Sequence, residues 1–67
     1  MTEKTIDYTG KLAILVDDDP DMLFQLQTHL EALGFEVRTG ENQAEGENLI
    51  AENEPDLAVF DLMMDYQ

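Results

Sequence analysis

Aspartate residues follow directly on two separate apolar runs of the sequence. Leu12–Val16 is followed by Asp17 and Asp18, and Leu57–Phe60 is followed by Asp61. If the two runs lie side by side, these carboxylates meet in one cluster, and their mutual repulsion must be relieved by protonation or by a cation. A site that offers only hard oxygen ligands suits Mg²⁺, which takes one or two carboxylates together with waters and a phosphate oxygen.

Some of the aspartates that follow the first apolar run also have a purely structural explanation. Asp19 stands directly before Pro20, so it can cap the start of a helix, and Asp21 falls in the first turn, where the helix dipole favours a negative charge. This explanation accounts for the cap but not for Asp17 and Asp18. On these residues alone, a capped loop and a ligand site are equally supported.

The elements that would position the carboxylates are strands and helices in alternation. Apolar residues without a polar face indicate buried strands at Leu12–Val16 and Leu57–Phe60. Leucines at intervals of three and four predict a helix over residues 20–33, and a weaker pattern predicts a second helix over residues 42–52. Between the helices, residues 35–39 alternate in polarity, which is typical of a strand near a sheet edge.

This order of elements predicts where the aspartates lie. A helix between two strands returns the chain to its starting direction, so we expect right-handed crossovers and a parallel α/β sheet. The carboxyl ends of all strands then lie along one edge, where open α/β sheets place their ligands. With the first and third strands as neighbours, about 4.8 Å apart, Asp17 and Asp18 meet Asp61.

Composition narrows the classes of function. The 67 residues leave room for one domain at most, and 16 acidic against 3 basic residues give a formal net charge of −13. This charge argues against direct binding of nucleic acid or of an anionic membrane, and it favours a cation or a basic partner. The sequence has no cysteine, which excludes disulfides and thiolate chemistry. It shows no signal peptide and no apolar run of membrane-spanning length, so we expect a cytoplasmic protein.

The two aspartate-terminated runs also carry a family resemblance. ILVDDDPD at residues 14–21 and PDLAVFDLMM at residues 55–64, separated by helix, strand and helix patterns, resemble the amino-terminal half of a response-regulator receiver domain. The resemblance implies a truncated flavodoxin-like fold, βαβαβ, with a parallel three-stranded sheet in the order 2-1-3. We expect residues 11–67 to form this half domain. Residues 1–10 are polar and without a sustained period, so we expect a disordered leader there.

The resemblance further implies a role for each site residue. Asp61 matches the aspartate that accepts a phosphoryl group from the phosphohistidine of a sensor histidine kinase or phosphotransfer protein. Asp17 and Asp18 match the acidic pair that holds Mg²⁺ beside that aspartate, and Met63 matches the residue whose backbone carbonyl completes the metal shell. The implied function is a phosphoacceptor module of two-component signal transduction. We do not expect an enzyme, because the sequence shows neither a nucleophile paired with a general base nor a pocket for an external substrate.

The sequence departs from the family pattern at two points. Asp65 stands where receiver domains commonly have proline. The sequence also stops at Gln67, before the family's fourth and fifth strands and before the hydroxyl residue and lysine that respond to the phosphoryl group. A third strand left at the sheet edge predicts self-association, through residues 57–60 or through exposed helix faces.

Two other interpretations of the aspartates can be compared with this one. A calcium loop would use Asp17, Asp19 and Asp21, but its required glycine and closing glutamate would fall on Met22 and Thr28. A truncated acidic interaction or scaffold fragment without a competent phosphorylation switch would use the aspartates only as caps and solvated loops. A magnesium titration followed by a phosphodonor test distinguishes this fragment from a receiver.

Overall fold

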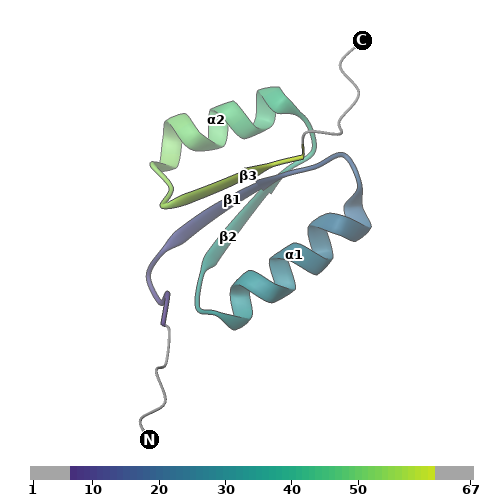
Figure 1. The fold of residues 1–67 in the computed structure, drawn as a ribbon. Coiled ribbons are helices and arrows are strands. Elements are labelled where there is room, and N and C mark those ends of the chain that lie inside the picture. Colours follow the sequence, from purple (N-terminus) through teal and green to yellow (C-terminus); the bar gives the residue numbers. More distant parts are fainter. Residues whose placement is uncertain (1–6, 62–67) are drawn as a thin grey trace, which may run out of the picture.

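The structure, a computed structural model, describes residues 7–61 as an α/β fold in which a sheet lies between two helices (Figure 1). The predicted order of strands and helices is confirmed, with bounds that differ from the expected ones by a few residues at most. The elements are β1 (Leu12–Val16), α1 (Pro20–Ala32), β2 (Glu36–Gly40), α2 (Gln43–Asn53) and β3 (Leu57–Phe60).

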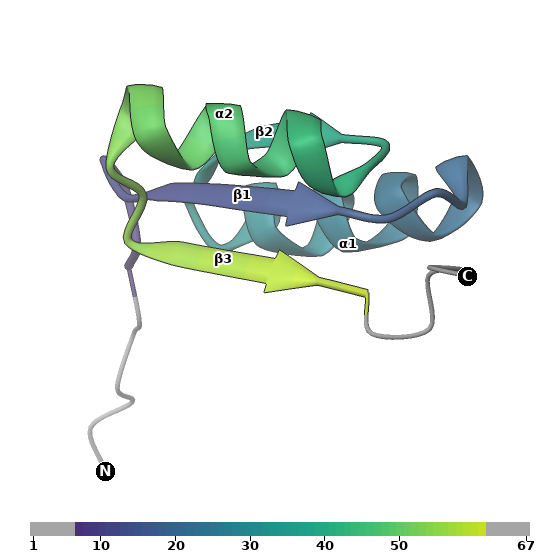
Figure 2. The same cartoon turned by 90° about the horizontal axis from the view of Figure 1, so that it is seen from above.

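The sheet is parallel and has the order β2-β1-β3, as predicted. At its carboxyl edge Val16 pairs with Gly40 on one side and with Phe60 on the other. Backbone hydrogen bonds continue one residue further, because the Asp17 N–H donates to the Gly40 carbonyl at 3.2 Å and the Asp61 N–H donates to the Val16 carbonyl at 3.0 Å. The residues that follow β1 and β3 therefore start at the same level of the sheet, and Figure 2 shows both strands ending at this edge.

The core is centred on β1, the middle strand. Its residues 13–16 are at most 1 % exposed, because α1 and α2 cover opposite faces of the sheet (Figure 1). The helices add Leu23 from α1 and Gly46 from α2. This burial on both sides explains why the first apolar run has no polar face.

Both helices begin at capping side chains. The carboxylate of Asp19 accepts a hydrogen bond from the Asp21 N–H at 3.0 Å, directly before Pro20 in the first turn of α1. The side chain of Asn42 accepts from the Glu45 N–H at 2.9 Å and caps α2 in the same way. The predicted structural role of Asp19 is thus confirmed, and it accounts for one aspartate of the cluster after β1.

The predicted leader at residues 1–10 lies partly outside the described residues. In its described part, the Tyr8 ring stacks on Phe35 with ring centroids 4.7 Å apart, and the Tyr8 N–H donates to the Leu33 carbonyl at 3.0 Å. These contacts hold Tyr8 against the loop that connects α1 to β2. The boundary between leader and domain stays a prediction.

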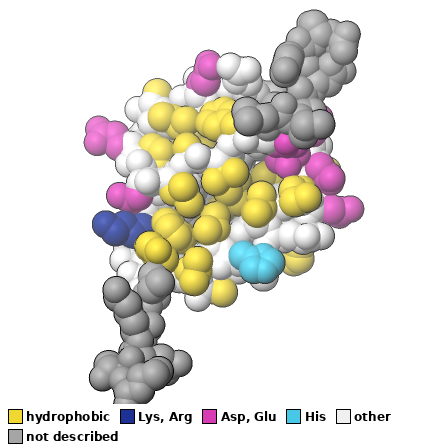
Figure 3. Space-filling view, in the orientation of Figure 1, with side chains coloured by type: hydrophobic (Ala, Val, Ile, Leu, Met, Phe, Trp, Pro, Cys, Tyr) yellow, Lys and Arg dark blue, Asp and Glu magenta, His cyan; other side chains and the backbone are white. Residues whose placement is uncertain are grey.

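The two helices cover the sheet unequally. Within residues 7–61, α2 packs against all three strands, whereas α1 packs against β1 and β2 but not against β3. Beside α1 the surface is therefore hollowed and rich in apolar side chains, with acidic groups around its margin (Figure 3). Leu57 and Val59 of β3 line two separate hollows there, of about 560 and 370 Å³. Neither of the described helices is long and apolar enough to cross a membrane.

Candidate functional site

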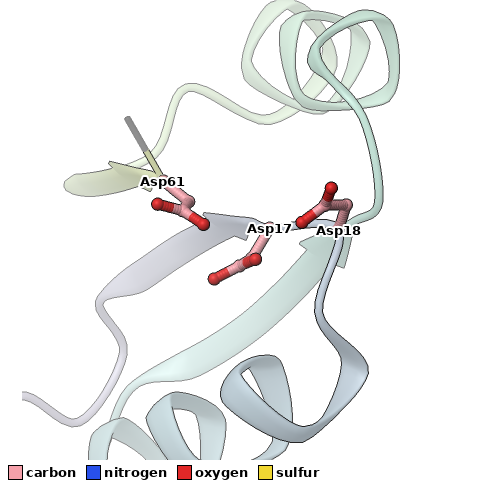
Figure 4. Close-up of side chains that lie close together, drawn as sticks. All are labelled: Asp17, Asp18 and Asp61. Carbon is pink, nitrogen blue, oxygen red and sulfur yellow. The ribbon is translucent and has the colours of Figure 1, made fainter. Parts of the chain in front are cut away.

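The structure brings three of the predicted site residues together at the carboxyl edge of the sheet. Asp17 and Asp18 follow β1, and Asp61 follows β3. One carboxylate oxygen from each of the three lies within 4.8 Å of the other two. Figure 4 shows the three side chains grouped where the two strands end. The residues that the structure describes contain no other such group of three acidic, histidine or cysteine side chains.

The three carboxylates differ in exposure. Asp17 is only 4 % exposed, Asp61 is half-buried and Asp18 is exposed. Consecutive residues that leave a strand point to opposite sides, which explains why Asp17 turns inward and Asp18 turns toward solvent. The cluster therefore has a buried side and a side open to a ligand from solution.

The capped loop fixes the buried carboxylate. Oδ1 of Asp17 accepts a hydrogen bond from the Asp19 N–H at 2.9 Å, and Asp19 in turn caps α1. Asp19 thus links the helix cap to the site, so the cap and the ligand site are compatible explanations of the aspartates after β1. The sequence pattern did not predict this hydrogen bond.

The surroundings of the Asp17 carboxyl group shift its pKa. The hydrogen bond from the Asp19 N–H lowers the pKa of the Asp17 carboxyl, but burial together with hydrogen bonding to Asp61 and repulsion from Asp61 and Asp18 outweighs it. The net result is a pKa above the ordinary value. Both a proton and a cation relieve this repulsion, so a bound cation would compete with the proton at Asp17.

The donor set fits a magnesium ion. All three side chains offer carboxylate oxygens, which is the ligand chemistry that Mg²⁺ prefers. The three side chains could hold this ion together with waters, because Mg²⁺ usually keeps several waters and takes only one or two carboxylates directly.

Two further residues need a separate account: one is a predicted ligand, and the other lies away from the site. The remaining predicted ligand, the backbone carbonyl of Met63, lies outside the described residues. At the opposite end of the sheet, Asp56 was not singled out from the sequence, yet its carboxylate accepts from the Leu12 N–H at 2.9 Å and its own N–H donates to the Leu12 carbonyl at 2.9 Å. Asp56 thereby ties the start of β3 to the start of β1, and the only sequence signal for it was its place just before the apolar run.

The parallel βαβαβ arrangement is that of an open α/β domain, and such domains bind their ligands at the carboxyl edge of the sheet, where the acidic cluster lies. A family model described as the response regulator receiver domain matches residues 13–67. The chain therefore belongs to the response regulator receiver domain family, as its motifs predicted.

Curated relatives agree with this family. The chain is 41 % identical over 56 residues to the transcriptional regulatory protein PrrA of Mycobacterium tuberculosis, covering 84 % of this chain and 24 % of PrrA. It is 36 % identical over 55 residues to the transcriptional regulatory protein GltR of Pseudomonas aeruginosa, covering 82 % and 23 %. It is 33 % identical over 51 residues to the protein PilH of the same species, covering 76 % and 42 %. The chain thus spans about a quarter of the length of PrrA and GltR, and no solved structure gives a significant match.

Proposed function

We propose that Asp61 accepts a phosphoryl group from the phosphohistidine of a sensor histidine kinase or phosphotransfer protein, with Mg²⁺ held by Asp17, Asp18 and Asp61. The observation that supports this proposal is the convergence of the three carboxylates, from two strands, within 4.8 Å. Membership of the receiver family supports the same reaction. We propose the Met63 carbonyl as a further metal ligand on the motif alone.

The chemistry at Asp61 is a direct phosphoryl transfer. A carboxylate oxygen of Asp61 forms a bond to phosphorus while the bond from phosphorus to the donor's imidazole nitrogen breaks, and the electron pair leaves with the imidazole. The Asp61 backbone is fixed for this step, since its N–H donates to the Val16 carbonyl. Asp17 and Asp18 hold the cation beside it. Mg²⁺, when bound, neutralises the carboxylates and binds phosphoryl oxygens.

A phosphodonor experiment tests this assignment. The protein is incubated with acetyl phosphate and Mg²⁺, and intact mass and peptide mapping report the phosphorylated residue. We expect one phosphoryl group on Asp61, and none in the Asp61→Asn variant. The matched control is Asp19→Asn, which removes a neighbouring charge while asparagine keeps the helix cap. Label retained in Asp61→Asn, or label lost equally in the control, would contradict the assignment.

The alternative function, an acidic interaction or scaffold fragment, gives a different result in the same experiment. The fragment would fold and would carry no label at any aspartate, with or without Mg²⁺. The formal charge of −13 is consistent with such a fragment, but it does not account for three carboxylates held together, one of them buried, at the sheet edge. We therefore favour the phosphoacceptor.

We also propose where this module acts and what else it contacts. We propose a cytoplasmic protein that binds neither nucleic acid nor membrane directly, because its formal charge of −13 repels phosphate groups. We propose self-association through β3 or the exposed helix faces. In the described part of the chain β3 pairs only with β1, its four residues carry no charge, and Leu57 is 36 % exposed. Uncharged edge strands of this kind favour pairing with another chain.

A further inference from the structure

Gly46 is a residue whose place in α2 calls for an explanation. It lies inside the helix and is the buried residue of α2. Glycine is less favourable than alanine in a helix interior, and α2 already has a weak apolar pattern. A helix of this kind would be more stable with alanine, so the reason for glycine must be sought in what it contacts.

The contacts of Gly46 leave no space for a side chain. A Cβ atom placed on Gly46 would overlap Cγ2 of Val16, and it would lie 3.0 and 3.1 Å from Cε2 and Cζ of Phe60. The close approach extends to β2, because a Cβ on Gly40 would lie 3.3 Å from the Gly46 nitrogen. Any side chain at Gly46 must therefore either lift α2 from the sheet or push on the side chains of Val16 and Phe60 at the strand ends beneath it.

Those strand ends are the ones that carry the acidic site. Val16 and Phe60 are paired across β1 and β3, and they immediately precede Asp17 and Asp61. The Val16 carbonyl also accepts the hydrogen bond from the Asp61 N–H. If the pressure on these well-packed side chains shifts the backbone of Val16 or Phe60, the shift reaches a carboxylate of the cluster through one peptide unit or one hydrogen bond.

We propose that Gly46 is a positioning residue for the acidic site: by lacking a side chain it lets α2 seat Val16 and Phe60 so that Asp17 and Asp61 share one cation. This proposal rests on the proposed magnesium site. Gly46 acts through its two neighbours, and it contributes no ligand itself. A side chain at this position changes the spacing of the carboxylates while their chemical identity stays the same.

Magnesium affinity, measured by calorimetric titration of the whole chain, tests the proposal. Supporting residues around metal ligands typically change metal affinity by about 10- to 100-fold when altered. We expect Gly46→Ala to weaken Mg²⁺ binding by about tenfold and Gly46→Val to weaken it further. The control is Ala51→Gly, an exposed change on α2 that lowers helix propensity and leaves Mg²⁺ affinity unchanged.

A rescue variant separates positioning from general packing. Removing Cγ2 in Val16→Ala relieves the closest contact that a Cβ on Gly46 would make and leaves only the contacts with the edge of the Phe60 ring, so we expect the double variant G46A/V16A to bind Mg²⁺ within about twofold of V16A alone. These measurements are made in buffered sucrose, which stabilises folded states, and circular dichroism confirms folding. If Gly46→Ala does not fold alone, the comparison of the double variant with V16A decides the question.

The possible failures are distinguishable. If the wild-type chain does not bind Mg²⁺, the proposed function fails. If the wild-type chain binds Mg²⁺ and folded Gly46→Ala and Gly46→Val bind it equally well, the positioning role of Gly46 is wrong. A change in the urea midpoint of Gly46→Ala without any change in Mg²⁺ affinity would likewise assign Gly46 to packing alone. A double variant that binds more weakly than V16A would also overturn the proposal.

Discussion

Replacement of Asp17 by asparagine should stabilise the metal-free protein, although it alters a buried residue of the site. Asparagine keeps a side-chain oxygen that can accept the hydrogen bond from the Asp19 N–H, so this contact is retained. What is lost is a negative charge that lies next to Asp61 and Asp18 and is only 4 % exposed. The substitution therefore isolates the effect of charge.

The magnitude follows from the separation of the carboxylates. At 4.8 Å, the upper limit of the oxygen separations in the cluster, two unit charges repel by about 1 kcal/mol in bulk water and about 3.5 kcal/mol at an effective dielectric constant of 20. Asp17 is buried and its partners are more exposed, so the expected gain lies between these limits. For a domain of this size, each kcal/mol raises the melting temperature by about 4 to 8 °C.

Urea unfolding at pH 7 measures this gain. Far-ultraviolet circular dichroism is the probe, because the chain has no tryptophan. In EDTA, Asp17→Asn should be more stable than the wild type. Saturating Mg²⁺ should then stabilise the wild type by about 2.7 kcal/mol at 100 times the dissociation constant. The variant should gain much less, so its advantage shrinks or reverses. Glu52→Gln, an exposed charge on α2, is the control and should stay within about 0.5 kcal/mol of the wild type in both buffers.

Two outcomes would refute this reasoning. If Asp17→Asn is less stable than the wild type in EDTA, the Asp17 carboxylate is a net structural contact and not a repelled ligand. If wild type and variant gain equally from Mg²⁺, the cation binds elsewhere.

Four further predictions concern the same domain. In metal-free buffer, the raised pKa of Asp17 means that the folded state holds this proton more tightly, so the free energy of unfolding should fall as pH rises from 3.8 through the raised pKa. The fall should be absent from urea titrations of Asp17→Asn. Leu23→Ala should cost about 2 to 5 kcal/mol in urea unfolding, since Leu23 is 7 % exposed, whereas Phe24→Ala, at a side chain 70 % exposed, should be nearly neutral. Asp18→Asn should weaken Mg²⁺ binding in calorimetry and leave metal-free stability nearly unchanged, because Asp18 is exposed; an unaltered affinity would remove Asp18 from the site. Self-association should increase with salt in sedimentation experiments, because salt screens the repulsion between acidic chains. Leu57→Lys should abolish association through β3 and leave association through the helix faces, and a monomer at every salt concentration would contradict both proposed interfaces.

The main features of the fold were predictable because they depend on local patterns and on handedness. The leucine stripe in residues 20–33 and the apolar runs at 12–16 and 57–60 are signals within single elements. Parallel direction then follows from helical crossovers. The neighbouring places of β1 and β3 came from the family resemblance, and the structure confirms them.

The details of the site were less predictable, since they depend on packing between distant segments. Burial of Asp17 beside an exposed Asp18 depends on α1 covering the sheet. From the sequence, Gly46 lowers the helix propensity of residues 42–52, which is tolerable if a small residue there lets the helix approach the sheet closely. Its contacts with Val16 and Phe60 exist only once α2 lies on both strands. The hydrogen bond from Asp19 to Asp17 likewise joins two features that the sequence suggests separately.

The central claim is that Asp17, Asp18 and Asp61 form one site for a divalent cation. Mn²⁺ has the same preference for oxygen ligands as Mg²⁺ and broadens nuclear magnetic resonance signals close to it. Substoichiometric Mn²⁺ added to the labelled protein should broaden the amide signals of these three residues first and together, and excess Mg²⁺ should restore them. Broadening that is spread over the acidic surface of α2, with sharp signals at the three aspartates, would contradict the claim.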